Sequence, residues 1–352
     1  MIELKKAHEL DIVELTEDLP EYGLRHGAQG TVVEVFDTPE EAYMVEFSED
    51  AGSSSTIADW ITPDQIKNIS AIANGFYKRG MEALSQGNFV ESLRELRKAV
   101  KLIPSYIGGM HNSLAQSVGP HDDWRGFIFA MRLVRLIDPD YEVARDNLAI
   151  AYLNYGVQEA KNGKYEESLL YFHAGLAVEA SPEIVTLIKE NIAASQTALG
   201  IQAFHNDDMQ SNLAFFRSAH FIASNEITRL NFAKAHFHFA NFCLNKGNLQ
   251  LAIDSYARVE DAGLMLPDVL NNHACALVES KLFEDAMRIL ETAQAIAPED
   301  EIIKSNLDKL LKISQISPLN VETTILDFIP KDSEINFLSP PPVNTVPLRL
   351  AA

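Results

Sequence analysis

The chain has 352 residues, of which 47% are hydrophobic, and these values predict a globular protein of about two domains. Its 50 acidic and 29 basic residues give a net charge of −21, which disfavours direct binding to nucleic acid or to an anionic membrane. Two cysteines are too few for a disulfide-rich secreted scaffold, so we expect a cytoplasmic location. No signal peptide and no membrane span of about 18 apolar residues is predicted.

Residues 1–69 differ from the rest of the chain in charge and in hydrophobic period. They contain 4 Lys/Arg and 16 Asp/Glu, a net charge of −12. Apolar residues alternate with glutamates in three short runs, and this spacing is typical of half-buried strands. The runs are Val13 with Leu15, Val33 with Val35, and Tyr43 with Val45 and Phe47. Turns rich in Gly, Pro and Ser separate them, so the segment is predicted to form a small antiparallel barrel.

Several short motifs in this segment occur together in a known family. They are Asp11 with Val13 and Leu15, the run EDLPEYGL, the G-x-x-G-T-V-V run over 27–33, and Val45-Glu46-Phe47. On these motifs, residues 9–69 resemble a short bacterial family of unknown function, and the resemblance implies an SH3-like barrel. The segment also resembles, loosely, the RNA-contacting KOW motif, but its loops offer only Arg25 and His26 among many carboxylates. We expect Gly27 and Gly30 to serve the turn itself.

From about residue 70 the hydrophobic period becomes helical, and one motif recurs. Its clearest copy places Phe76, Gly80, Gly87, Phe89, Ser92, Leu96, Ala99 and Pro104 within residues 76–104. This pattern resembles the tetratricopeptide repeat (TPR), a helical hairpin of about 34 residues. Further clear copies lie at 152–182 and 272–298, and weaker copies at 108–141, 193–226 and 233–266. Six hairpins are therefore predicted, with an extended or irregular helix over 183–204 and a capping helix over 301–315.

The chain is thus predicted to be mainly α: an SH3-like barrel over 1–69, a TPR-like solenoid over 70–315 and a tail over 316–352. The tail contains two apolar, proline-containing runs, TTILDFIP and INFLSPPP. Its prolines exclude a long helix, and its apolar side chains are unusual for a solvated linker. Two interpretations stay open: the tail docks on its own solenoid, or it presents a recognition motif to another protein.

Sequence motifs for catalysis or for cofactor binding are absent, so we expect no enzyme activity, no cofactor and no metal. His236 and His238 are two residues apart and project to different helix faces, which disfavours a helical zinc pair. The clusters at 121–123 and 205–208 are predicted to be turn and helix N-cap residues. Cys243 and Cys275 are predicted to be buried thiols.

Stacked TPR hairpins form a groove lined by the first helix of each hairpin, and such grooves bind polypeptides. The resemblance implies that exposed positions of these helices contact the partner. In this register they are Tyr77, Met81, Asn112, Gln116, Leu153, Val157, Thr197, Ile201, Phe204, Phe237, Asn241 and Asn271. The Lys and Asn pair by which chaperone-binding TPR proteins hold a C-terminal carboxylate is not reproduced.

The leading hypothesis is a non-catalytic scaffold or adaptor that binds a peptide or protein segment in this groove. The alternative is an acidic regulator whose N-terminal domain imitates a phosphate surface for a basic, nucleic-acid-handling protein. A third class, an enzyme with a site of a new kind, is kept as a minor alternative.

Overall fold

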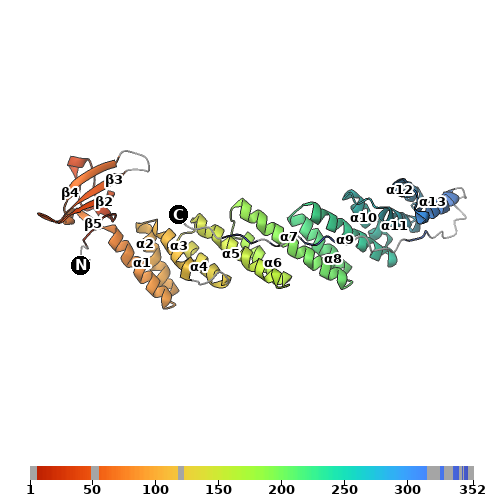
Figure 1. The fold of residues 1–352 in the computed structure, drawn as a ribbon, viewed down its shortest axis with the longest axis horizontal. Helices are drawn as coiled ribbons and strands as arrows, with labels where there is room; N and C mark the ends of the chain where they lie inside the picture. The colour runs from red at the N-terminus through yellow and green to blue at the C-terminus, as the bar shows by residue number, and fades with distance from the viewer. Residues whose placement is uncertain are drawn as a thin grey trace. The chain divides into compact units, whose positions relative to one another are not determined.

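The computed structural model describes residues 6–48, 55–117, 123–314, 326–328, 336–340, 343 and 345–347. The chain divides into two compact units: unit 1 comprises residues 1–148 with 348–352, and unit 2 comprises residues 149–347. Unit 1 starts with a β-sheet and continues into helical hairpins, and the described part of unit 2 is built from further hairpins, as Figure 1 shows.

The N-terminal sheet has five antiparallel strands among the described residues. They are β1 (Ile12–Leu15), β2 (Gln29–Phe36), β3 (Ala42–Ser48), β4 (Ser55–Ile61) and β5 (Ile66–Asn68). Their order is β4-β3-β2-β1-β5, and no pairing in the described part of the chain joins β4 to β5. The predicted strands and turns are therefore present in an open sheet, and the closed SH3-like barrel stays a prediction.

The sheet buries one face, as the alternating pattern indicates. Val13, Leu15, Val45 and Phe47 belong to its core. Val33 differs from the prediction, because it is 46% exposed while its neighbour Val32 is fully buried. The register between β2 and β3 shifts between Val32 and Glu34, and this bulge exchanges the faces of neighbouring side chains.

The two glycines of the G-x-x-G turn act in different ways. Gly27 has φ of 85°, a left-handed conformation that favours glycine. Gly30 lies within β2, and a Cβ there would stand 2.6 Å from the Val45 side chain and 2.8 Å from the Glu46 carbonyl oxygen. Glycine at position 30 therefore lets β2 approach β3.

Thirteen α-helices follow in the described residues. In unit 1 they are α1 (Ile69–Ser85), α2 (Phe89–Leu102), α3 (Tyr106–Ser117) and α4 (Trp124–Ile137). Helix α5 spans Glu142–Lys161. The helices that follow are α6 (Tyr165–Leu176), α7 (Pro182–His205), α8 (Met209–Ile222), α9 (Glu226–Asn245), α10 (Leu249–Asp261), α11 (Pro267–Glu279), α12 (Phe283–Ile296) and α13 (Glu301–Ser314). The helical hairpins of the predicted solenoid are thus present, and α7 is the extended helix expected over 183–204.

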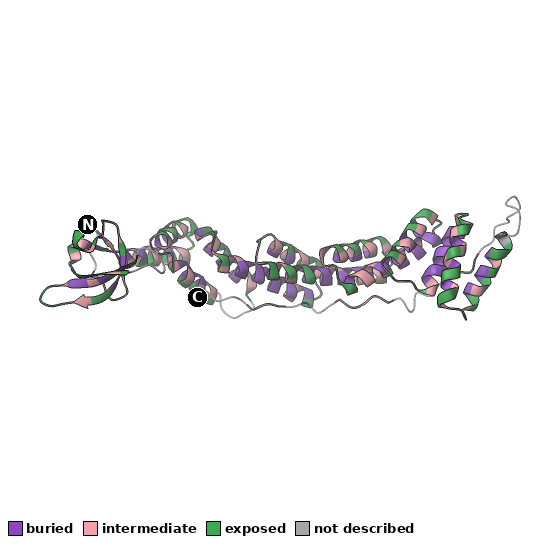
Figure 2. Ribbon diagram, turned by 90° about the horizontal axis from the view of Figure 1, so that it is seen from above, coloured by how far each residue is buried: buried purple, intermediate pink, exposed green. Residues whose placement is uncertain are grey.

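Small residues allow the paired helices to approach closely. A Cβ on Gly156 of α5 would stand 2.5 Å from Phe172 of α6, and one on Gly200 of α7 would stand 2.7 Å from Phe216 of α8. In each case glycine and aromatic residue are 16 positions apart, and both aromatic side chains are fully buried. The small and large residues of the repeat therefore form the tight crossing of each hairpin. Figure 2 shows the resulting stripes of buried residues along the helices.

The turn inside each described hairpin repeats as well. A residue with positive φ stands seven positions after the small residue at the helix crossing, and it is glycine at 87, 163 and 247. At the corresponding positions Asp207 and Lys281 adopt φ of 58° and 64°. Next to Asp207, the Asp208 carboxylate caps α8 by accepting the Ser211 amide at 3.0 Å, which confirms the predicted cap in the 205–208 cluster.

Helix α13 closes the last hairpin, as the predicted capping helix. Its buried Ile303, Leu307 and Leu310 belong to one core cluster with α9, α10, α11 and α12. Helix α1 begins at Ile69 and α13 ends at Ser314, whereas the division of the chain into domains at 69 and 315 stays a prediction.

Candidate polypeptide-binding groove

Unit 2 holds described residues of its own C-terminal tail against the first helices of its hairpins. Asp327 contacts α11 and α13, Leu338 contacts α9, and Val346 contacts α5. The tail therefore runs in the direction opposite to the order of the helices. Figure 2 shows it as a thin extended trace beside them. This face of α5, α9, α11 and α13 is called the groove below.

Three asparagines of the groove each bind both main-chain groups of one tail residue. In every pair the side-chain amide nitrogen donates to the tail carbonyl, and the side-chain oxygen accepts the tail N–H. The three pairs, called the tail clamps, are Asn154 with Val346 (2.8 and 3.0 Å), Asn231 with Leu338 (2.9 and 2.7 Å), and Asn306 with Asp327 (2.9 and 2.8 Å). This is the hydrogen-bonding pattern by which a neighbouring strand holds a residue, and it involves no tail side chain.

The clamp at Asp327 includes a second asparagine. Asn271 of α11 donates to the Asp327 carbonyl at 3.0 Å, and its own side-chain oxygen accepts the Asn306 amide at 2.8 Å. Asn271 and Asn306 are both fully buried. Because a buried amide without partners is costly, these paired side chains are prepared for a main-chain ligand. A salt bridge of 2.8 Å between Lys309 and the Asp327 carboxylate adds to this clamp.

An aromatic pocket receives Phe337, the residue before the clamped Leu338. The Phe337 ring stacks on Phe216 with centroids 4.4 Å apart and planes at 15°. It meets Phe204 edge-on at 5.2 Å and lies 5.3 Å from the His238 ring. These three side chains, called the Phe337 pocket, come from α7, α8 and α9. The pocket fits a large planar side chain.

A lysine fixes the residue before Phe337. Lys234 of α9 donates from Nζ to the Asn336 carbonyl at 2.6 Å. Burial lowers the pKa of Lys234 from its ordinary value. Three consecutive tail residues are therefore held by a lysine, an aromatic pocket and an asparagine.

Two of the residues predicted for the groove contact the described tail, namely Phe204 and Asn271. Others in unit 2 are covered in the structure: Leu153, Val157, Thr197 and Phe237 are buried, and Ile201 is half-buried. Phe237 packs against Tyr256 in the core. Asn241 accepts a hydrogen bond from the Tyr256 hydroxyl at 2.5 Å, which joins α9 to α10.

The remaining predicted residues belong to unit 1. Tyr77 and Tyr106 form an aromatic pair with centroids 5.8 Å apart, Met81 and Asn112 are half-buried, and Gln116 is exposed. Their role in binding stays a prediction.

Sequence reasoning missed Asn154, Asn231 and Asn306, the three residues of the tail clamps. A signal was present, since one series of asparagines, at 154, 191, 231, 271 and 306, recurs at intervals of 35 to 40 residues and has one member in each of α5, α7, α9, α11 and α13. Asparagine is a poor residue for a helix interior, so its repetition there indicates a function other than helix formation.

Several predicted tail and loop residues lie outside the described part of the chain. They are His121, Asp122, residues 51–54 of the serine-rich turn, and Ile325, Ile329 and Ile335 of the tail. Of the described tail residues, Leu326 is buried in the core cluster of α11 and α13, and Phe328 packs against that cluster.

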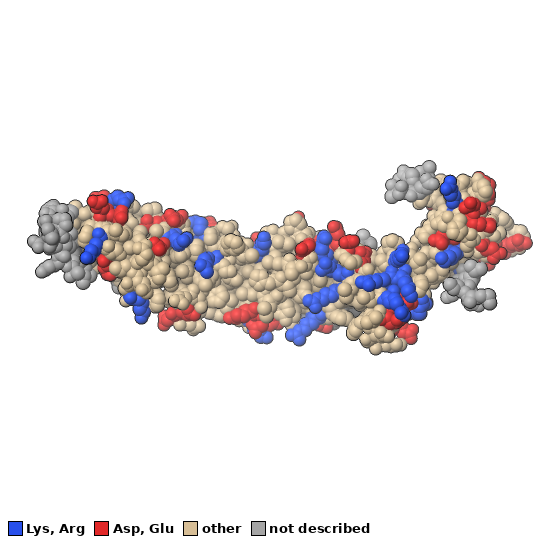
Figure 3. Space-filling view, turned by 180° about the vertical axis from the view of Figure 1, so that it is seen from behind, with Lys and Arg blue, Asp and Glu red and all other residues tan. Residues whose placement is uncertain are grey.

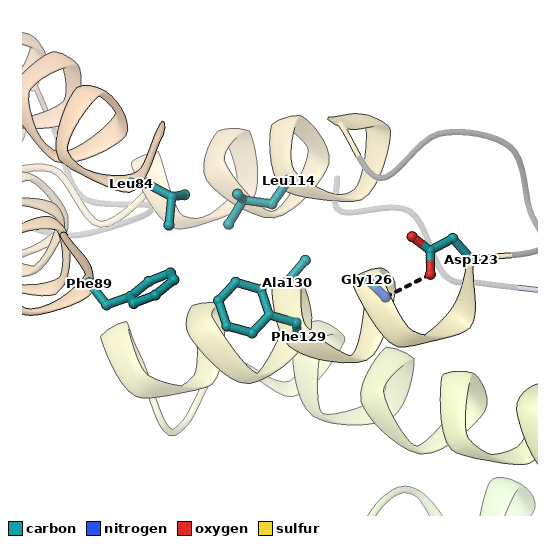
Figure 4. Close-up of a pocket in the computed structure, with 7 residues that line it drawn as sticks. All are labelled: Leu84, Phe89, Leu114, Asp123, Gly126, Phe129 and Ala130. Carbon is teal, nitrogen blue, oxygen red and sulfur yellow. Dashed lines mark hydrogen bonds between the residues drawn. The ribbon is translucent and has the colours of Figure 1, made fainter. Parts of the chain in front are cut away.

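Unit 1 has a second, smaller candidate site. A hollow of about 430 Å³ is lined by Leu84, Phe89, Leu114 and Phe129, with Asp123 and Gly126 at one end (Figure 4). The Asp123 carboxylate accepts the Gly126 amide there at 3.0 Å, so it serves as the N-cap of α4. The hollow is open and its polar group is already satisfied, which makes it a weaker candidate than the groove.

Charge is unevenly distributed over unit 1. Figure 3 shows Asp and Glu gathered on the sheet and Lys and Arg gathered on the nearby helices. Glu34 and Glu46 are exposed on the neighbouring strands β2 and β3. On α2, Lys98 at 2.6 Å and Arg79 of α1 at 2.8 Å hold the buried Glu95 and lower the pKa of its carboxyl.

The cysteines and histidines form no shared site in the described residues. Cys243 and Cys275 are buried free thiols, as predicted, and burial raises the pKa of Cys275 to about 12. His236 packs on Phe232, whereas His238 is part of the Phe337 pocket. Within the described ranges, no group of three His, Cys, Asp or Glu side chains could hold a metal ion, and no helix is long and apolar enough to cross a membrane.

A family model matches the N-terminal part of the chain. Residues 9–66 match a family described as a domain of unknown function (DUF4926). The match covers the N-terminal sheet and assigns no activity. No curated protein matches the chain.

The solved structures similar to this chain include TPR proteins. The TPR2AB domain of yeast Sti1, in complex with pHSP90, is 13% identical, with 70% of this chain and 99% of that chain covered and a TM-score of 0.29. The TPR domain of P58(IPK) is 13% identical, with 69% and 65% covered and a TM-score of 0.32. A TPR repeat protein of Bacteroides fragilis is 13% identical, with 68% and 98% covered and a TM-score of 0.28. At these TM-scores the likeness assigns no function to this chain.

Proposed function

We propose that this protein is a non-catalytic interaction scaffold whose groove binds an extended protein segment through its main chain. The tail clamps are the observation that carries the proposal. Each clamp satisfies one N–H and one C=O of the bound chain, and these are the groups that every polypeptide offers. A segment from another protein can make the same hydrogen bonds wherever it replaces the tail.

The burial of the clamp residues supports a specific binding site rather than a chance contact on the surface. Asn306 and Asn271 are fully buried, and the side-chain amide of each donates a hydrogen bond to the main-chain carbonyl of Asp327. Removing such a partner leaves a buried amide unpaired, at a cost of about 1–3 kcal/mol. The groove therefore favours an occupied state, in which the occupant is its own tail or a partner segment.

The test uses a fluorescent synthetic peptide of residues 334–343 and the full chain carrying Leu338→Pro. Proline lacks the N–H that Asn231 accepts, so the chain's own tail is weakened in the groove. We expect saturable binding of the peptide, measured by fluorescence anisotropy. N-methylation of the peptide at Leu338 should weaken binding roughly tenfold or more, because it removes the same donor and leaves the Asn231 oxygen unpaired.

N-methylation at Ser339, an exposed tail residue, is the matched control and should change the affinity little. A peptide that shows no saturable binding would refute the proposal. So would an equal loss from the two methylated peptides, since main-chain recognition at Leu338 predicts a difference between them.

A second candidate function rests on the acidic sheet of unit 1. Glu34 and Glu46 are exposed on the adjacent strands β2 and β3. We propose, as the alternative, that this surface attracts a basic partner. It does not compete with the groove for the same residues, so both contacts can occur in one protein.

A further inference from the structure

The Phe337 pocket gives the groove a preference that the tail clamps alone do not provide. The clamps contact only main-chain atoms, whereas the pocket surrounds one side chain on three sides. Phe216 is fully buried and His238 is 4% exposed, so the pocket has largely dry walls. A ring that enters this pocket gains stacking and apolar contact that a small side chain cannot make.

The pocket exists because of the small residue at the helix crossing. Gly200 has no side chain, which allows the Phe216 ring to lie against α7, and Phe337 stacks on that same ring. Phe204, four residues after Gly200 on the same helix, supplies the edge-on contact. The crossing of α7 and α8 therefore places two aromatic side chains beside the tail.

The pocket and the Asn231 clamp act at a fixed register. Lys234 holds the Asn336 carbonyl, the pocket holds the Phe337 ring, and Asn231 holds Leu338. In an extended chain adjacent side chains alternate in direction, so a ring one residue before the clamped position meets the pocket and a ring at the clamped position does not.

We propose that partners of the groove carry an aromatic residue directly before the residue held by Asn231, and that tail residues 336–340 are a built-in competitor for the same site. The inference rests on the proposed function and adds the chemistry of the segment and its regulation. A tethered tail acts at an effective concentration on the order of millimolar, so a partner must displace it. Apparent affinity for an external segment is therefore lower than the intrinsic affinity of the groove.

The experiment compares peptides of residues 334–343 that differ only at position 337, bound to the full chain carrying Leu338→Pro. We expect the Phe337→Ala peptide to bind at least tenfold more weakly than the natural sequence. The Phe337→Tyr peptide should stay within about threefold, because a phenol ring keeps the stacking surface. All substitutions are in the peptide, so the fold of the chain is not affected.

Two variants of the chain separate the pocket from the clamp. In the chain that carries Phe204→Ala, the affinities of the natural and the Phe337→Ala peptides should differ by a smaller factor than they do in the chain with Phe204. With Asn231→Ala, both peptides should lose affinity by a similar factor. Each variant is first shown to unfold at a temperature close to that of its parent.

Competition by the tail is tested on the chain with its natural sequence. It should bind the natural peptide at least tenfold more weakly than the Leu338→Pro chain does. If the two chains bind the natural peptide with equal affinity, the tail is not a competitor. If the Phe337→Ala and natural peptides bind with equal affinity, the groove has no aromatic preference. Either result leaves the proposed function in place, whereas failure of every peptide to bind would refute the proposed function itself.

Discussion

Asn231 of α9 holds Leu338 of the tail by both of its main-chain groups, at 2.9 and 2.7 Å, although 107 residues separate them in the chain. A side-chain amide has the same donor and acceptor as a peptide group. The Asn231 side chain therefore takes the place of one residue of a neighbouring strand, and its contact with the tail involves only main-chain atoms of Leu338.

The first prediction concerns this contact. Asn231→Ala should accelerate hydrogen exchange of the Leu338 amide by roughly tenfold or more, because the amide loses its acceptor and the tail opens locally more often. Exchange measured by mass spectrometry or NMR reports the change. Asn245→Ala, an exposed asparagine at the end of the same helix, is the control and should have no effect. Unchanged exchange in Asn231→Ala would contradict the clamp.

The second prediction concerns Asn241, which sequence reasoning placed in the groove. Because Asn241 is buried and accepts the Tyr256 hydroxyl, Asn241→Ala should lower the free energy of unfolding by about 1–3 kcal/mol. Urea unfolding of Asn241→Ala, Tyr256→Phe and the double variant measures the coupling between the two side chains. Strictly additive losses would show that the two side chains are not coupled.

The third prediction concerns the repeated turn. Lys281 adopts φ of 64° at a position where other hairpins have glycine. Lys281→Gly should leave stability unchanged or raise it by up to about 1 kcal/mol, since relief of the left-handed conformation outweighs the added freedom of the unfolded chain. The reverse change, Gly247→Ala, should be destabilising by about 1 kcal/mol or more. Thermal unfolding measures the change in stability of both variants. A loss of stability in both Lys281→Gly and Gly247→Ala would refute the argument.

The fourth prediction concerns pH. Burial, followed by the charges of Arg258 and Arg217, lowers the pKa of His236 to about 4. Because the unfolded chain binds this proton near pH 6.5 and the folded chain does not, stability should fall as pH falls from about 6.5 to about 4. The contribution of this group is about 3 kcal/mol at most. His236→Gln should flatten the dependence, and His205→Gln, at an exposed position, should not.

The fifth prediction concerns the acidic sheet. If it attracts a basic partner, replacing Glu34 and Glu46 by Gln should slow association and weaken its dependence on salt. Association with a polylysine peptide, followed by stopped-flow fluorescence at several salt concentrations, measures both. An unchanged rate and an unchanged salt dependence would indicate an ordinary solvated surface.

The hairpins could be predicted from the sequence because their packing repeats along the chain. Gly156 and Phe172, or Gly200 and Phe216, stand 16 residues apart, and the same spacing brings them together at the helix crossing. The bulge in β2 could not be predicted, since the one extra residue between Val32 and Glu34, Val33, faces the solvent although the local composition is that of an ordinary strand.

The groove residues were harder to predict for a different reason. Repeat position alone does not say whether a side chain such as Leu153 or Phe237 points to the groove or to the core, and both are buried. The clamp residue Asn231 belongs to an earlier turn of its helix than the positions that family resemblance indicated. Its role depends on where the tail lies, which is a long-range property of the fold.

The separation of the three tail clamps along the tail has a consequence for how quickly a partner segment replaces the tail in the groove. The contacts at Asn306, Asn231 and Asn154 are separated by 11 and 8 tail residues, as the positions of Asp327, Leu338 and Val346 show. An incoming segment can therefore pair with one asparagine while the other two still hold the tail, and it can then advance by strand exchange. The exchange rate would rise with the concentration of the incoming segment, because complete dissociation of the tail is not required first.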